Sequence, residues 1–170
     1  MPDQSLLFLL DEVRGKTLRL LQSVTDQEAH WPPPELHNHI LWHAGHSFVL
    51  VESLAMEAVG DLPQIPEGWF EIFSWQSKPA QIASYRWPPL ARTIAQLTEQ
   101  HVRLRRVIEG LSEAQLCRPL PGRGNHTARY AILHALHDEA CHSGEIWLLC
   151  KLIRTSAMEK SHDHHAGGNS

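Results

Sequence analysis

The sequence predicts an all-α protein, arranged as a four-helix bundle with a long crossover between the second and third helices. Three observations lead to this fold class. Apolar residues recur at steps of three and four in four long segments. The alternating pattern of β-strands is weak throughout the chain. A proline-rich stretch separates the second helical segment from the third, which is typical of bundles with one crossover connection.

Length and composition indicate one soluble domain. The 170 residues fit the usual domain size of roughly 100–200 residues, so we expect a helical domain over residues 1–155 and a flexible, histidine-containing tail over 156–170. The formal charge of −4 gives no reason to expect nucleic acid or an anionic membrane as a partner. Three cysteines, no apolar run of membrane-spanning length and no basic leader favour the cytoplasm.

The first helix is expected from Ser5 to Val24, where a stripe of apolar residues recurs with helical spacing. Thr25 and Glu28 then form a capping-box pattern, which predicts a short further turn of helix. The three prolines at 32–34 predict an extended connection, because proline cannot donate a backbone hydrogen bond.

The second helix is expected from Asn38 to Val59, with Asn38 as its N-cap and Gly60 just past its end. This segment is apolar nearly all round, which indicates a deeply buried helix.

The crossover spans residues 61–89 and contains five prolines. It is also rich in aromatic side chains, namely Trp69, Phe70, Phe73, Trp75, Tyr85 and Trp87. Long loops inside compact domains are usually functional, so we expect an ordered segment that covers one end of the fold. Its aromatic residues could wall a substrate pocket or form a hydrophobic cap, and both interpretations stay open.

The third helix is expected from Leu90 to Leu111, with a solvated basic face at Arg103, Arg105 and Arg106. A loop rich in proline and glycine follows, over residues 117–125. Thr127 should then cap the fourth helix, from Ala128 to Ile153.

The sequence has thirteen histidines, and their positions on the buried faces point to a metal site. Asp138 and His142 lie four residues apart in the middle of the apolar stripe of the fourth helix, so one ion could contact both. A buried carboxylate is costly unless it is paired or bound to a metal. His43 and His46 lie one turn apart in the buried second helix. Two histidines and a carboxylate from facing helices would form a three-ligand site.

Other interpretations of these residues remain open. Asp138 and His142 could form a structural ion pair, and a buried histidine is often only hydrogen-bonded. His134 and His137 are alternative ligands, and His137 with Cys141 has the same spacing on a flanking row of the helix. The tail histidines could bind metal adventitiously. Surface positions are expected for the remaining histidines, namely His30, His37, His39, His101 and His126.

Two stretches resemble motifs of the DinB-like superfamily. The first is NHILWHAGH, from Asn38 to His46, and the second is HDEACHSGEI, from His137 to Ile146. The resemblance implies metal ligands at His46, Asp138 and His142. Most members carry histidine where this chain has Asp138, whereas mycothiol-dependent maleylpyruvate isomerase, a similar protein, uses a carboxylate there. Zn²⁺ or Ni²⁺ is the implied metal, with Fe²⁺ or Mn²⁺ as alternatives.

The resemblance implies a thiol-dependent S-transferase or hydrolase that takes a small-molecule substrate and a low-molecular-weight thiol. Glu139, Glu145, His43 and His137 are the candidates for proton transfer, and the sequence does not rank them. The two alternatives are a non-haem iron redox enzyme, since two histidines and a carboxylate suit Fe²⁺, and a non-catalytic metal-binding stress protein. The basic patch and the six tryptophans lead us to expect a homodimer.

Overall fold

The computed structural model describes residues 1–33, 36–77 and 85–166, with side chains as far as residue 156. Within these ranges the protein is all-α, as predicted, and its only β feature is a single bridge between Pro119 and Thr127. Pro34 and Pro79, which belong to the predicted connections, lie outside the described residues. None of the described helices combines the length and hydropathy that crossing a membrane requires.

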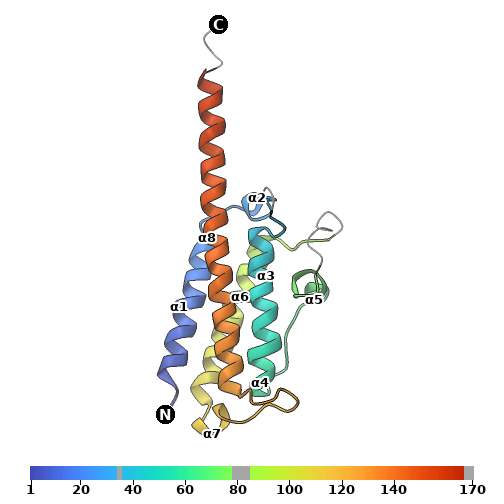
Figure 1. Ribbon diagram of the computed structural model, residues 1–170, viewed down its shortest axis with the longest axis vertical. Coiled ribbons are helices and arrows are strands. Elements are labelled where there is room, and N and C mark those ends of the chain that lie inside the picture. The colour runs from blue at the N-terminus through green and yellow to red at the C-terminus, as the bar shows by residue number, and fades with distance from the viewer. Residues whose placement is uncertain (34–35, 78–84, 167–170) are drawn as a thin grey trace.

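Four long helices run alongside one another (Figure 1): α1 (Gln4–Leu21), α3 (Ile40–Val51), α6 (Leu90–Gly110) and α8 (Ala128–Ala166). Both α6 and α8 contact both α1 and α3. The buried apolar residues form two main clusters at different heights. One is built around Leu41, Phe48, Phe73, Leu97 and Ile146, and the other around Leu10, Met56, Leu104, Ile132 and Leu136.

Helix α1 begins and ends close to its predicted limits. Asp3 caps it, because its side chain accepts hydrogen bonds from the backbone N–H groups of Ser5 and Leu6. The short helix α2 (Asp26–Ala29) has the predicted capping box, in which Thr25 and Glu28 each bond the other's backbone N–H.

The second predicted helix differs in its start and in its interior. Its N-cap is His39 rather than Asn38, since His39 Nδ1 accepts the N–H of Trp42 at 3.0 Å. All residues of α3 are buried, as its apolar composition predicts. The chain then passes through a π-helical turn, η1 (Glu52–Met56), into α4 (Glu57–Val59). It ends at Gly60, which has the left-handed φ of 84° that favours glycine.

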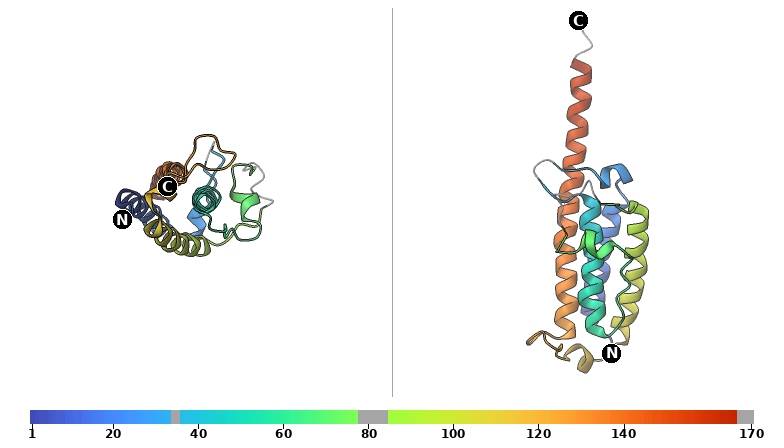
Figure 2. Two further views of the ribbon diagram at one scale, coloured as in Figure 1. Left: turned by 90° about the horizontal axis from the view of Figure 1, so that it is seen from below. Right: turned by 90° about the vertical axis from the view of Figure 1, so that its right-hand side faces the viewer.

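The crossover contains a short helix, α5 (Trp69–Phe73), that lies against the side of α3 rather than over an end of the fold. Figure 2 shows α5 on the side of α3 that faces away from α1. Trp69 and Phe73 are buried there. The contact is close, because a Cβ atom at Gly45 would lie 2.4 Å from the Phe73 ring. The expectation of an end cap was therefore wrong, and the glycine in α3 is what admits α5.

The C-terminal half has one helix more than predicted and a longer final helix. A short helix, α7 (Glu113–Leu116), follows α6. Thr127 caps α8 as predicted, accepting the N–H of Tyr130 at 3.2 Å. The backbone of α8 stays helical to Ala166, past the predicted end at Ile153, and projects beyond the other helices (Figure 1). No proline or glycine occurs between these two residues to end it.

A buried polar network joins the long helices. Arg14 of α1 is fully buried and makes two hydrogen bonds to the Glu139 carboxylate of α8, at 2.7 and 2.8 Å. It also donates to the carbonyl of Leu97 and to the side chain of Gln100. A buried charge needs such partners, and here all three are supplied by α6 and α8.

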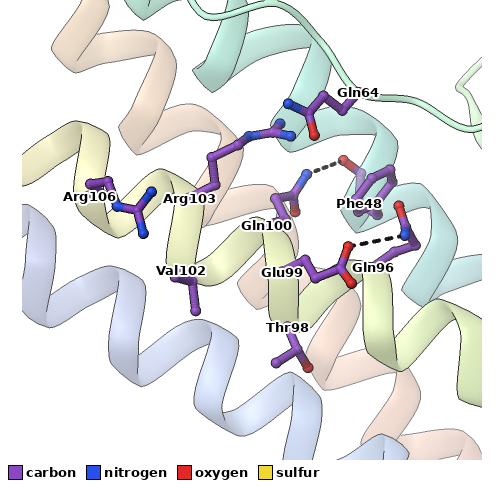
Figure 3. A pocket seen from close by; sticks show the side chains of 9 residues that line it. All are labelled: Phe48, Gln64, Gln96, Thr98, Glu99, Gln100, Val102, Arg103 and Arg106. Carbon is purple, nitrogen blue, oxygen red and sulfur yellow. Dashed lines mark hydrogen bonds between the residues drawn. The ribbon is translucent and has the colours of Figure 1, made fainter.

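Gln100 extends the network to α3, because its amide donates to the Phe48 carbonyl at 2.9 Å (Figure 3) and to Glu52 at 2.7 Å. Glu52 is fully buried and pairs with Arg103. The predicted solvated face at residues 103–106 is therefore only partly correct. Arg103 turns inward to this carboxylate, beside a hollow of about 410 Å³, while Arg106 is exposed.

Candidate metal centre

Helices α3 and α8 bring together the three side chains that the sequence singled out as ligands. His46 comes from α3, and Asp138 and His142 come from successive turns of α8. One nitrogen or oxygen of each lies within 4.8 Å of the others. Asp138 Oδ2 is 3.7 Å from His46 Nε2 and 3.3 Å from His142 Nε2.

Hydrogen bonds determine which ring nitrogen of each histidine faces this cluster. His46 Nδ1 lies 2.6 Å from the carbonyl oxygen of Phe73, which can only accept, so Nδ1 carries the proton. His142 Nδ1 lies 2.6 Å from Glu145 Oε2, an ionised carboxylate oxygen, and is protonated for the same reason. In their neutral forms both histidines therefore present the lone pair of Nε2 to Asp138.

When both histidines are neutral, three lone pairs converge, which fits a cation. Asp138 Oδ2 is buried and accepts no hydrogen bond. A tetrahedral ion with bonds of about 2.0–2.1 Å separates its ligand atoms by about 3.3–3.4 Å, close to the observed spacings. Ligand histidines commonly donate their other N–H to a carbonyl or carboxylate, as both do here. The donor set suits Zn²⁺ and other first-row transition metals.

The surroundings set the charge of each group. Burial lowers the pKa of His46 and outweighs the opposing hydrogen bond to Phe73. Burial also works against charge on His142, but Asp138 and Glu145 prevail and raise its pKa. His142, whose Nε2 lies 3.3 Å from Asp138 Oδ2, lowers the pKa of Asp138, and the hydrogen bond from His43 lowers the pKa of Glu145 to about 2. Both carboxylates are therefore anionic at neutral pH.

His43 and Trp42 complete the environment. His43 Nδ1 lies 2.9 Å from both Glu145 Oε2 and His142 Nδ1, so these three residues form a second compact group that shares His142. The Trp42 ring stacks on His46, with centroids 4.7 Å apart and an interplanar angle of 14°. These contacts hold the rings of His142 and His46 in place beside Asp138.

The cluster lies close to the protein surface. The Asp138 side chain is 34% exposed, whereas those of His46 and His142 are 7% and 15% exposed. Three protein ligands beside solvent match the pattern of catalytic sites, which keep a coordination position open.

Several other predicted roles change in the structure. Glu139 is not a proton donor for the site, because it is fully buried against Arg14. His137 and Cys141 are exposed, with Cys141 Sγ 4.0 Å from His137 Nε2, and belong to neither compact group. His39 is buried rather than exposed, and burial lowers its pKa to about 4.

The Phe73 carbonyl, which is the partner of His46, could not be predicted from the sequence. A backbone carbonyl leaves no signal in sequence, although an unusual glycine at position 45 of a buried helix marks the close approach of another segment. Glu145 and His43 were unranked candidates for proton transfer in the sequence, and the structure places both against His142.

Known proteins were compared with this chain by family, by fold and by sequence. The model of the DinB superfamily matches residues 9–146. The fold is similar to that of a conserved protein from Enterococcus faecalis, with a TM-score of 0.76 and 18% identity, covering 91% of this chain and 99% of that one. A search of curated proteins finds no match. Since the family model spans most of the sequence, the chain belongs to the DinB superfamily.

Proposed function

We propose that this protein is a metal-dependent enzyme of the cytoplasm that acts on a small thiol, as an S-transferase or hydrolase. His46, Asp138 and His142 would hold one divalent transition metal, with Zn²⁺ or Ni²⁺ favoured over Fe²⁺ or Mn²⁺. The observation that carries the proposal is the convergence of three possible ligand atoms, one of them a buried carboxylate oxygen without a hydrogen bond. We further interpret the four long helices as a four-helix bundle whose crossover is residues 61–89.

The charge of the site supports thiol chemistry. Two neutral imidazoles and one carboxylate leave a dipositive ion with a net charge near +1, which lowers the pKa of a nearby thiol and favours its thiolate form. Trp42 and the buried face of α3 exclude water on one side and so strengthen that attraction. The exposed edge at Asp138 gives a small thiol a path to the site. Glu145 holds the ring of His142 in place through its hydrogen bond.

Spectroscopy of the Co²⁺-loaded protein tests this function. Mycothiol, bacillithiol, glutathione and cysteine are added in turn, and we expect at least one to produce a charge-transfer band in the near ultraviolet. A spectrum that none of them changes at millimolar concentration contradicts the thiol proposal. His46→Ala serves as the control, since it should lose both the metal and the band. The tail histidines at 162, 164 and 165 are replaced by alanine in every sample, so that they cannot bind metal.

A redox function with iron is the second candidate, because two histidines and one carboxylate also form the ligand set of non-haem Fe²⁺ oxygenases. Elemental analysis of anaerobically purified protein separates the two. Iron in place of zinc or nickel, with no response to thiols, would favour the redox function.

A further inference from the structure

A pocket with a volume of about 240 Å³ lies beside the N-terminal part of α8. Its lining comes from η1, from the loop before α8 and from the first turns of α8, and comprises Leu54, Leu120, Arg123, Tyr130 and His134, with Ala131 and His126.

Helical spacing connects this pocket to the metal ligands. On α8, Tyr130, His134, Asp138 and His142 recur every four residues, so they form one row along the helix. On the segment formed by α3 and η1, Leu54 follows His46 by eight residues. One helical step of four residues is about 6 Å, so His134 brings the pocket within one turn of Asp138.

The loop that forms the outer wall is held by its own hydrogen bonds. Leu120 N–H donates to the carbonyl of His126 at 2.8 Å, and Arg123 and His126 are bonded to neighbouring carbonyls within the loop. Gly122 and Gly124, with φ of 70° and 62°, flank Arg123 and allow the tight turns that present it. Arg123 is therefore placed by a defined loop.

The lining has a consistent chemistry. Leu54, Leu120 and Ala131 supply apolar surface, and the ring of Tyr130 stacks on His126 with centroids 4.1 Å apart. Arg123 and the two histidines supply N–H donors, and none of the described lining residues is acidic. Arg123 contacts Glu57 only at 3.4 Å in an exposed pair, which contributes little and is easily exchanged for another anion.

We propose that this pocket binds an aromatic carboxylate, with Arg123 holding the carboxylate group and Tyr130 stacking on the ring. This assignment rests on the proposed function, in which the pocket holds the second, non-thiol substrate about one helical turn from the metal. A planar guanidinium recognises a carboxylate through paired hydrogen bonds, and an aromatic ring suits the stacked wall.

Binding of 4-fluorobenzoate to the metal-free 170-residue protein, followed by ¹⁹F NMR, tests the proposal. We expect Arg123→Gln to weaken binding by about tenfold, the loss typical of a hydrogen bond to a charged group. Tyr130→Ala should weaken it as well, whereas Tyr130→Phe should retain it. The matched control is Arg106→Gln, an exposed arginine on α6 (Figure 3), which should bind as the parent protein does.

Two comparisons complete the test. The neutral 4-fluorobenzamide should bind more weakly than the benzoate, and His46→Ala should leave benzoate binding unchanged. Equal effects of Arg123→Gln and Arg106→Gln, equal binding of amide and acid, or loss of binding in His46→Ala would each overturn the proposal. Because no metal or thiol is present, a failure of the thiol function leaves these results unaffected.

Discussion

Replacing Gly45 with alanine tests whether α5 holds the candidate metal ligand in place. Glycine in a helix interior costs about 0.5–1 kcal/mol relative to alanine, so the substitution alone would stabilise α3. The new Cβ, however, would lie 2.4 Å from two carbons of the Phe73 ring. Carbon atoms pack best at about 3.5–4.0 Å, so α5 must move by about 1 Å or more. Such overpacking costs about 1–3 kcal/mol, which leaves a net destabilisation of up to about 2.5 kcal/mol.

The same movement should weaken metal binding. Phe73 also supplies the carbonyl oxygen that lies 2.6 Å from His46 Nδ1, and this bond keeps Nε2 directed at Asp138. Losing such a support for a ligand histidine typically lowers metal affinity by about 10–100-fold. We therefore expect Gly45→Ala to bind Zn²⁺ about 10-fold or more weakly in competition with a chelating dye. Urea unfolding of the metal-free protein measures the stability change.

A control and a rescue separate this cause from general damage. Gly144 lies in α8 with open space around its missing Cβ, so Gly144→Ala should gain about 0.5–1 kcal/mol and keep its zinc affinity. The double variant Gly45→Ala with Phe73→Leu removes the ring but keeps the carbonyl, and should recover much of the lost affinity. If Gly45→Ala behaves like Gly144→Ala in both assays, the role assigned to α5 is wrong.

Four further outcomes are expected. Asp138→Asn should weaken Zn²⁺ binding more than His137→Ala, because only Asp138 faces His46; the reverse order in a titration would transfer the ligand role to His137. Glu145→Gln should lower zinc affinity by about 10-fold or more in the same dye competition, since it removes the anionic acceptor of His142, and an unchanged affinity would argue against that support. His39 has a pKa of about 4 in the folded protein against 6.5 ordinarily, so the unfolded chain binds more protons between these pH values. The free energy of unfolding should therefore fall as the pH drops from 6.5 towards 4, by up to about 3 kcal/mol. His39→Asn keeps an N-cap, and its urea midpoint should depend less on pH over this range. Light scattering should give the mass of a dimer at all concentrations, and a monomer mass would contradict the expected association.

Features specified by neighbouring residues could be predicted from the sequence. The limits of α1, the capping box at Thr25 and the cap at Thr127 depend on side chains within a few positions of the helix end. The grouping of Asp138 with His142 follows from spacing on one helix in the same way. The identification with the DinB superfamily from two short motifs is confirmed by the family match.

Features that depend on contacts between distant segments could not be predicted. Helix α5 is short, and it packs on α3 at Gly45, which precedes Phe73 by 28 residues in the chain. His39 is preferred over Asn38 as a cap because its ring also packs against Trp87 of the crossover. The inward turn of Arg103 depends on Glu52, which no local pattern marks as buried. Partners of this kind are fixed by tertiary packing.

The buried pair of Arg14 and Glu139 limits how the sequence of this protein can evolve. Removing one partner of a buried ion pair costs about 3–5 kcal/mol, whereas replacing both by well-packed apolar residues is often neutral or favourable. Domains are stable by only about 5–15 kcal/mol, so either single replacement would consume a large part of the total. Evolution can therefore replace this ion pair mainly by substituting Arg14 and Glu139 together, or after other substitutions have stabilised the protein. Glu139 directly follows Asp138 on α8. An exchange of this pair that rotated α8 about its axis would therefore also move the candidate ligands Asp138 and His142 away from His46.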